Sequence, residues 1–197
     1  MRITLITDFV ALSQWTQALD QAIHRWGIPR MPTALWVRNL PAQAPTSVGQ
    51  ALKRLQAQHS LSLEYSWAHR GQAPHGATVH VPDALQLREE SQSWHGPRIL
   101  SLHDLKDADQ VLSTQGEDQV LLAPWRQPIS KAHVGPTLDQ RAARTLASNH
   151  PDRVHVVGGL RPEDYHDLRD QGFASMALLG AFTASPAACW QALTELS

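Results

Sequence analysis

Residues 153–162 read RVHVVGGLRP, and residues 175–182 read SMALLGAF. Each run begins as a short apolar strand and ends in small residues, which is typical of a buried strand followed by a tight turn. Pro162 stands where the next helix is expected to begin, and Tyr165 and Leu168 continue that helix with apolar spacing. Strand, helix and strand in this order predict one unit of a parallel sheet.

The same alternation extends from this unit back to the amino terminus. The apolar runs that we predict to be strands are Ile3–Thr7, Thr33–Val37, Leu61–Tyr65, Thr78–Val81, Ile99–Leu102, Gln119–Leu122, Arg153–Val157 and Ser175–Leu179. Stretches of helical period lie between them, such as the apolar face of Trp15, Leu19 and Ile23. Eight buried parallel strands close a barrel, so we predict one α/β domain over residues 1–197 with the TIM (β/α)8 barrel fold.

Several residues mark expected helix ends. Asp104 is expected near the start of one helix, and Thr46 or Ser47 is expected to cap another. The glycines expected just after helices are Gly27, Gly116 and Gly172. Residues 66–76 and 83–96 are polar and show no clean period.

The composition describes a folded protein without a strong electric field. The formal net charge is -1 and 18% of the residues are charged, which gives no overall attraction for nucleic acid or anionic lipid. No run approaches the roughly 18 apolar residues of a membrane span. The single cysteine, Cys189, leaves no disulfide within these residues and is interpreted as helix core. We therefore expect a cytoplasmic protein that binds neither nucleic acid nor membrane.

Small residues after the last two strands predict a phosphate site. The active face of such a barrel lies at the carboxyl ends of its strands. Gly158 and Gly159 precede a predicted helix, where backbone N–H groups and the helix amino terminus favour an anion. Gly180 and Ala181 form a second small-residue turn after the eighth strand. The alternative is that Gly158 and Gly159 only make a tight turn.

A long connection that is rich in hydrogen-bond donors follows the sixth predicted strand. Long loops in compact domains often bind ligands or act as lids. Arg126, Ser130 and Lys131 are candidates to hold a second anionic group, such as a pyrophosphate or a carboxylate. The alternative is a solvated basic loop.

Arg38 directly follows a buried apolar run, and a cation in that position needs a partner. The partner is either a strand-end acid, Asp8 or Glu64, or a ligand phosphate. His80 and His103 are interpreted as satisfied core or rim histidines. The sequence contains no zinc spacing, Gly-x-Ser-x-Gly elbow, P-loop or dinucleotide fingerprint.

The order of these motifs resembles thiamine-phosphate synthase and its TenI relatives over essentially the whole chain. The matching segments here are LITD at 5–8, Arg38, VHV at 79–81, SLH at 101–103, residues 124–131, the glycine pair at 158–159 and GAF at 180–182. The family pattern runs LITD, QLREK, GVHLGQ, S-x-H, GPxFxTxTK, GGI and S-A-I. The resemblance implies the TIM barrel fold.

The resemblance also implies roles for individual residues. The synthase groups that bind pyrophosphate are matched by Arg38, Ser101 and Lys131, which are therefore the catalytic candidates. Ser130 stands where the family has threonine, and keeps a hydroxyl. The glycines whose amides hold the thiazole phosphate are matched by Gly158 and Gly159, whereas Gly180 replaces the serine that assists them.

The chain departs from the family at the metal site and at the tautomerase histidine. The synthase holds Mg²⁺ with two carboxylates, and neither acid stands at its family position here. Asp83 and Glu64 are the nearby candidates for a magnesium site. Without the metal, departing pyrophosphate loses its main charge neutralisation. The histidine of characterised tautomerases corresponds to Pro124 in this chain.

Three hypotheses follow. The first is an enzyme of thiamine metabolism that acts on a thiazole phosphate, either as a divergent synthase that joins it to a pyrimidine pyrophosphate or as a TenI-like thiazole tautomerase. The second is a non-catalytic or regulatory barrel that keeps the phosphate pocket. The third is another phosphate-handling barrel enzyme that uses Lys131 as an amine nucleophile. The first two imply thiazole phosphate or thiamine phosphate as the partner molecule, and self-association of family members makes a homo-oligomer an expectation.

Overall fold

The computed structural model describes residues 1–8, 12–38, 50, 54, 56–57, 61–83, 85–114, 116, 118–127 and 137–196. Eight parallel strands in sequence order close into a barrel, because β8 pairs with β1. The strands are β1 (Arg2–Asp8), β2 (Thr33–Arg38), β3 (Ser62–Ser66), β4 (Val79–Val81), β5 (Arg98–Leu102), β6 (Gln119–Leu122), β7 (Val154–Val157) and β8 (Ser175–Leu178). The predicted TIM (β/α)8 barrel is confirmed.

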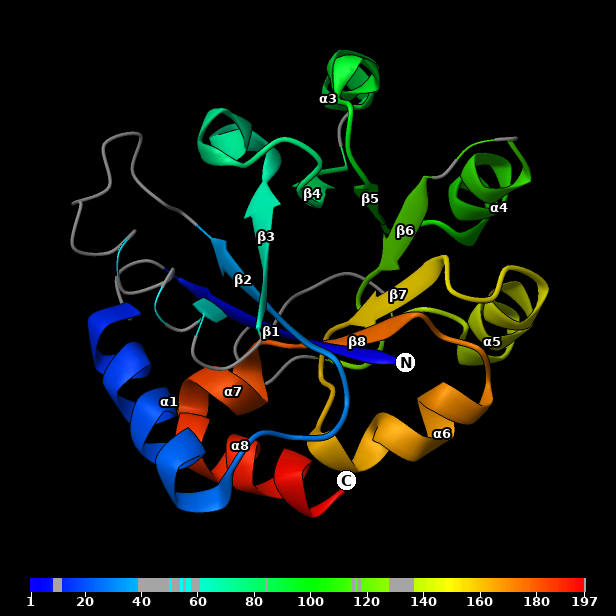
Figure 1. Ribbon diagram of the computed structural model, residues 1–197. Coiled ribbons are helices and arrows are strands. Elements are labelled where there is room, and N and C mark those ends of the chain that lie inside the picture. Colours follow the sequence, from blue (N-terminus) through cyan, green and yellow to red (C-terminus); the bar gives the residue numbers. More distant parts are fainter. Residues whose placement is uncertain are drawn as a thin grey trace.

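Helices surround the strands on the outside of the barrel (Figure 1). The α-helices are α1 (Leu12–Trp26), α3 (Leu85–Glu90), α4 (Leu105–Ser113), α5 (Gln140–Asn149), α6 (Tyr165–Asp170), α7 (Gly180–Ala184) and α8 (Pro186–Glu195). The 3-10 helices are η2 (Trp67–Gln72), η3 (Ser91–Ser93) and η4 (Pro162–Asp164). Residues 66–76, which show no clean period, contain η2, and residues 83–96 contain α3 and η3. These helices are too short to give the sequence a clear helical period.

All eight predicted strands agree with the observed strands to within one residue at either end. The agreement has a physical reason, since strands in a parallel barrel are covered on both faces and therefore read as continuous apolar runs. Every residue of β4 and of β8 is buried.

The expected helix ends are confirmed where the structure describes them. Asp104 caps α4, because its carboxylate accepts a hydrogen bond from the Lys106 amide at 2.6 Å. Gly27 follows α1, Gly116 follows α4 and Gly172 follows α6. The cap predicted at Thr46 or Ser47 lies outside the described residues.

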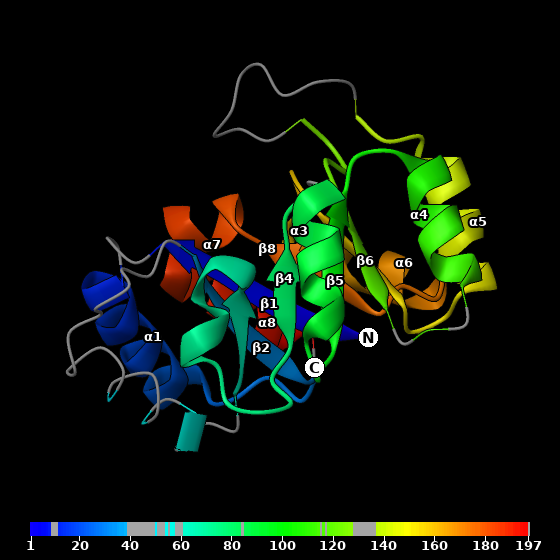
Figure 2. The ribbon, with the colours of Figure 1, turned by 90° about the horizontal axis from the view of Figure 1, so that it is seen from above.

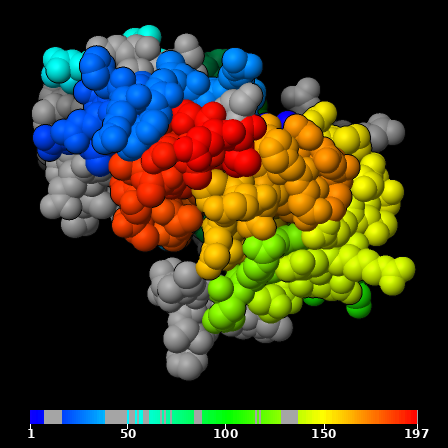
Figure 3. All heavy atoms as spheres, turned by 90° about the horizontal axis from the view of Figure 1, so that it is seen from below, coloured from blue at the N-terminus to red at the C-terminus, as the bar shows by residue number. Residues whose placement is uncertain are grey.

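The first and last helices complete the ring around the barrel. In the view from below, α8 (red) lies between α1 (blue) and α6 (orange) (Figure 3). The Trp190 indole of α8 donates a hydrogen bond to the carbonyl of Gly27 at 2.8 Å, directly after α1. Figure 2 shows α4 and α5 at the opposite end of the molecule from α1. Within the described residues, every helix is too short or too polar to cross a bilayer.

The apolar core has two parts. The larger part lies between the strands and the helices. A smaller cluster fills the inside of the barrel and consists of Ile6, Ile99, Leu121 and Ala177. Because strand side chains alternate between the two faces, every second residue of a strand points into the barrel. The inward-pointing residues nearest the carboxyl ends of the strands therefore line any cavity at that end of the barrel.

Candidate functional site

A cavity of about 960 Å³ opens at the carboxyl end of the barrel. All eight strands contribute at least one lining residue: Ile6, Trp36, Ser66, His80, Ser101, Leu121, Val157 and Ala177. Its volume is in the range of sites that enclose a small molecule. The strand ends therefore form the ligand-sized site that the fold predicts.

Most of the predicted site residues line this cavity. They are Arg38, Ser101, Gly158, Gly159, Gly180, Ala181 and Asp83. β7 and β8 are neighbours, with Val157 level with Ala177, so the two small-residue turns lie on the same side of the cavity. Ser130 and Lys131 lie outside the described residues.

The glycine pair after β7 adopts a backbone conformation that favours glycine. The φ angle is 106° at Gly158 and 63° at Gly159. A Cβ at Gly158 would lie 3.0 Å from the Cα of Pro124, and a Cβ at Gly159 would lie 2.8 Å from the Cβ of Arg126. Both positions therefore require glycine, because they pack closely on residues 124–126. This requirement agrees with the alternative that the two glycines make a tight turn. Among the described residues, the Gly159 amide has no backbone hydrogen-bond partner.

Arg126 lies outside the cavity lining and already has an anionic partner. Its guanidinium donates two hydrogen bonds of 2.8 Å to the carboxylate of Asp164. These hydrogen bonds raise the pKa of Arg126, and the Asp164 charge adds to the effect. Asp164 also accepts a hydrogen bond from the Arg161 amide at 2.9 Å. Arg126 thus ties the loop after β6 to the start of α6, and a phosphate would have to compete with Asp164 for it.

Arg38 stands at the rim without an ion pair to any described side chain. Glu64, one of the alternative partners, is not paired with Arg38, because its carboxylate contacts Arg2 at 2.7 Å and His80 at 2.6 Å. The side chain of Asp8, the other expected partner, is not among those described. Arg38 lines the cavity and is half-buried, which suits a contact to a ligand anion.

The two magnesium candidates do not form a metal site. Asp83 lines the cavity but is paired with Arg88. Glu64 is enclosed by Arg2 and His80. Among the described residues, no group of three histidine, cysteine or acidic side chains is placed to hold an ion. Because both carboxylates are already neutralised by cations, the described residues do not fit Mg²⁺.

The floor of the cavity contains a pair that the sequence interpretation missed. His80 was interpreted as a satisfied core histidine, and its Nε2 does donate to Glu64 at 2.6 Å. Its Nδ1, however, is buried without a hydrogen-bond partner among the described residues. The signal was present in the strand pattern, since Val79 and Val81 flank His80 and point outward, which sends His80 into the barrel.

The charge state of Glu64 follows from its surroundings. Burial alone would raise the pKa of this carboxyl, but the charge and hydrogen bond of His80, together with the charge of Arg2, hold the pKa at about 2. Glu64 is therefore ionised at neutral pH. An ionised carboxylate only accepts hydrogen bonds, which makes His80 Nε2 the donor.

A second buried histidine belongs to the barrel interior. His155 Nε2 donates to Gln119 Oε1 at 2.6 Å, and its Nδ1 accepts from the Ser175 hydroxyl at 2.6 Å. Burial, with the charge of Arg2, lowers the pKa of His155 to about 3. His155 is neutral at neutral pH and both ring nitrogens are satisfied, so we assign it a structural role.

Cys189 of α8 lines the cavity but is only 5% exposed. Burial raises the pKa of its thiol to about 12, and the nearby charge of Glu163 adds to the effect. A thiol in this state is protonated at neutral pH and is a poor nucleophile. The interpretation of Cys189 as a core residue is confirmed.

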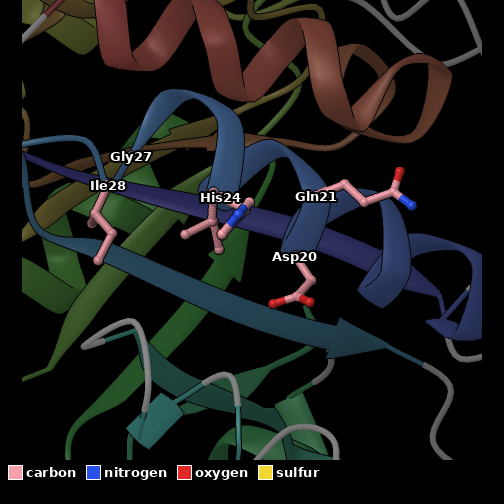
Figure 4. A pocket seen from close by; sticks show the side chains of 6 residues that line it. Asp20, Gln21, His24, Gly27 and Ile28 are labelled. Carbon is pink, nitrogen blue, oxygen red and sulfur yellow. The ribbon is translucent and has the colours of Figure 1, made fainter.

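A second cavity, of about 670 Å³, lies at α1 on the outside of the barrel. Figure 4 shows the side chains of Asp20, Gln21, His24 and Ile28 along it, together with Gly27. These residues come from one helix and the turn after it, rather than from several strand ends. Because it lacks converging strand ends, it is a weaker candidate for a small-molecule site than the cavity at the carboxyl end.

Comparisons with known proteins identify the fold. No protein-family model and no curated protein sequence matches the chain. Thiamine phosphate pyrophosphorylase from Pyrococcus furiosus has a TM-score of 0.67 and 13% identity, over 99% of this chain and 94% of that one. The pyrophosphorylase from Bacteroides thetaiotaomicron has a TM-score of 0.59 and 14% identity, over 100% and 97%.

A differently named enzyme has a TM-score between those two. The 3-hexulose-6-phosphate synthase from Salmonella typhimurium has a TM-score of 0.64 and 13% identity, over 100% of this chain and 98% of that one. At this level of identity, the likeness is one of fold. The chain thus shares its barrel with thiamine phosphate pyrophosphorylases and with other barrel enzymes.

Proposed function

We propose that the chain binds a phosphorylated thiazole in the cavity at the carboxyl end of its barrel, as a divergent relative of thiamine-phosphate synthase and TenI. The observation that carries the proposal is that Arg38, Gly158–Gly159 and Gly180–Ala181 all line one cavity. A guanidinium and exposed backbone amides are suitable partners for a phosphate dianion. The apolar side chains of Ile6 and Leu121 offer the ring an apolar surface.

The comparisons support the class of ligand. Thiamine phosphate pyrophosphorylase is another name for thiamine-phosphate synthase, so the likeness in fold agrees with the sequence motifs. The hexulose-phosphate synthase is also named for a phosphate ester. The names of these structures have a phosphate-bearing small molecule in common. The proposal that this molecule is a thiazole phosphate is based on the sequence motifs.

A reaction without Mg²⁺ suits the cavity better than the metal-dependent condensation. Asp83 and Glu64 are engaged by Arg88 and by Arg2, which favours TenI-like proton transfer over pyrophosphate displacement. A non-catalytic phosphate-binding barrel is the second candidate, because Pro124 stands where characterised tautomerases have a histidine. Turnover of a thiazole phosphate by the wild-type protein would exclude that candidate.

Isothermal titration calorimetry with thiazole phosphate and with the unphosphorylated thiazole alcohol tests the proposal. We expect the phosphate ester to bind at least about 10-fold more tightly than the alcohol, because a charge-assisted hydrogen bond contributes roughly 1.5–3 kcal/mol. Arg38→Ala should remove most of that difference. Gly180→Asp should weaken the ester in the same way, since a Cβ at Gly180 meets no atom within 4 Å and the new carboxylate repels the phosphate.

Arg25→Ala is the matched control. Arg25 lies on α1 with its guanidinium over the Trp26 ring, and it does not line the cavity. Its removal should leave the affinity for both ligands unchanged. Equal affinity of the wild-type protein for the ester and the alcohol, or no binding of either, would reject a phosphate site in this cavity.

A further inference from the structure

Glu64 and His80 form a hydrogen-bonded pair at the floor of the cavity, separate from the glycine turns on its rim. His80 lines the cavity, and its Nε2 lies 2.6 Å from Glu64 Oε2. Both residues are 3% exposed. A carboxylate beside an imidazole in this arrangement sets the tautomer and the orientation of the ring, as it does in hydrolytic triads.

Two further contacts hold the pair in place. The imidazole of His80 is stacked on the indole of Trp36, with ring centroids 3.7 Å apart and planes 6° from parallel. Trp36 is itself anchored, because its indole donates to the Ser66 hydroxyl at 2.9 Å. The guanidinium of Arg2 lies 2.7 Å from the other carboxylate oxygen of Glu64. The ring of His80 is therefore fixed on one face and at one nitrogen.

The pair lies beneath the cavity, because His80 lines it and Glu64 contacts His80 from below. Burying ionised groups costs several kcal/mol, and apolar side chains of similar volume often serve stability as well or better. The interior of this barrel also holds an apolar cluster that includes Ile6, Ile99 and Leu121, and His155 with its two polar partners. The Glu64–His80 pair is a polar part of this interior that lies next to the cavity, where a reacting ligand would lie.

The other ring nitrogen of His80, Nδ1, is buried and has no hydrogen-bond partner among the described residues. Because ionised Glu64 accepts a hydrogen bond from the Nε2–H of His80, the neutral form of this imidazole has its lone pair on Nδ1. An imidazole with one nitrogen held by a carboxylate and the other unpartnered is the arrangement of a general base.

We propose that His80 is the proton-accepting catalytic residue for the ligand in this cavity, and that Glu64 is its positioning residue. The inference rests on the proposed function for its ligand. In the step, a weakly acidic C–H or N–H bond of the ligand breaks, its proton passes to Nδ1, and the electron pair stays on the ligand. The imidazolium, stabilised by Glu64, then returns the proton to a second ligand atom. The product is an isomer, and no co-reactant is needed.

Several charged groups surround His80 and bear on its pH dependence. Glu64 faces it from β3, Arg2 from β1 and His155 from β7. Arg38 and His103 line the same cavity. His103 is the other described histidine that lines the cavity, and its Nδ1 lies 2.7 Å from the Ala123 carbonyl, its hydrogen-bond partner. If the rate of the catalysed step depends on pH in His103→Gln but not in His80→Gln, the pH dependence is due to His80.

Deuterium exchange into thiazole phosphate in D₂O, followed by proton NMR, tests the inference. We expect the wild-type protein to catalyse exchange of a ligand hydrogen. His80→Gln should slow the exchange by about 100-fold or more, and Glu64→Gln should slow it less while shifting its pH profile. His166→Gln on α6, outside the cavity, is the matched control and should leave the rate unchanged.

Calorimetry on the same proteins separates the two proposals. If thiazole phosphate binds but its hydrogens do not exchange, or exchange equally fast in His80→Gln, the role of His80 is rejected and the binding proposal stands. If nothing binds, the proposed function fails first. Should His80→Gln fail to fold, nitrogen-15 NMR of wild-type histidines decides instead. We expect the Nε2 of His80 to carry the proton that faces Glu64, and a neutral ring with its proton on Nδ1 would reject the inference.

Discussion

Replacing Gly158 by valine is expected to lower the free energy of unfolding by about 4 kcal/mol. The φ angle of 106° at this residue is strained for any side chain and worst for a β-branched one. A Cβ would also lie 3.0 Å from both the Cα and the Cβ of Pro124 and 3.1 Å from the Trp125 amide nitrogen. Backbone atoms on the neighbouring loop cannot move aside as the end of a side chain can.

The same loop is tied to the Gly158 turn by backbone hydrogen bonds. The Trp125 amide donates to the Val157 carbonyl at 2.9 Å, and the Arg126 amide donates to the Gly158 carbonyl at 3.0 Å. Trp125 is 1% exposed, so a shift of the loop would disturb the core as well. For a domain of this size the expected loss corresponds to a fall in Tm of roughly 10 °C, measurable by circular dichroism or calorimetry.

Gly180→Val is the matched control for the Gly158 prediction. A Cβ at Gly180 meets nothing within 4 Å, and its φ angle lies outside the left-handed region. The same substitution should therefore change the free energy of unfolding by less than about 1 kcal/mol. Equal loss of stability in the two variants would show that the turn after β7 tolerates a side chain, and that packing on the loop after β6 is not what requires glycine.

Lowering the pH from 6.5 to 3.5 is expected to reduce the free energy of unfolding by about 3–4 kcal/mol through His155 alone. The folded pKa of His155, about 3, lies below the value of an exposed histidine. Between these two values the unfolded chain binds a proton that the folded chain does not. Acid therefore favours unfolding, by about 1.4 kcal/mol for each pH unit, until the folded state also protonates.

Glu64 extends the same trend to lower pH. Its folded pKa, about 2, lies below that of an exposed glutamate, so its contribution to stability is present above the unfolded pKa and is lost as the pH falls toward 2. Between pH 6.5 and 4.5, most of the loss in the free energy of unfolding should therefore come from histidine. Carboxyl groups should contribute to the loss below pH 4.5.

Urea denaturation of wild type and of His155→Gln across this pH range measures the histidine contribution. Glutamine retains a donor and an acceptor toward Gln119 and Ser175, whose present hydrogen bonds to the ring are 2.6 Å long, but it does not titrate. We expect the variant to lose clearly less stability between pH 6.5 and 4.5 than the wild type. His166→Gln, at an exposed position of α6, should follow the wild-type curve. Parallel curves for wild type and His155→Gln would mean that another group is responsible.

The candidate site could be predicted in part. Gly158, Gly159 and Gly180 were found because small residues directly after a strand are a local signal, and local signals are readable in sequence. Arg38 and Ser101 were found in the same way, from their positions at strand ends. The partners of Arg126 and Glu64 could not be found, because Asp164 and Arg2 are 38 and 62 positions away along the chain and meet them only when the barrel closes.

The sequence by itself determined the barrel, since eight covered parallel strands must each carry a continuous apolar run and every such run was visible. What only the tertiary structure decided is which polar side chains share an environment. Inside a closed barrel, residues from distant strands are brought together at one level, and their charge states depend on those neighbours and on exclusion of water. The Glu64–His80 pair beneath the cavity and the neutral state of His155 arise in this way, from strand register and burial rather than from any motif.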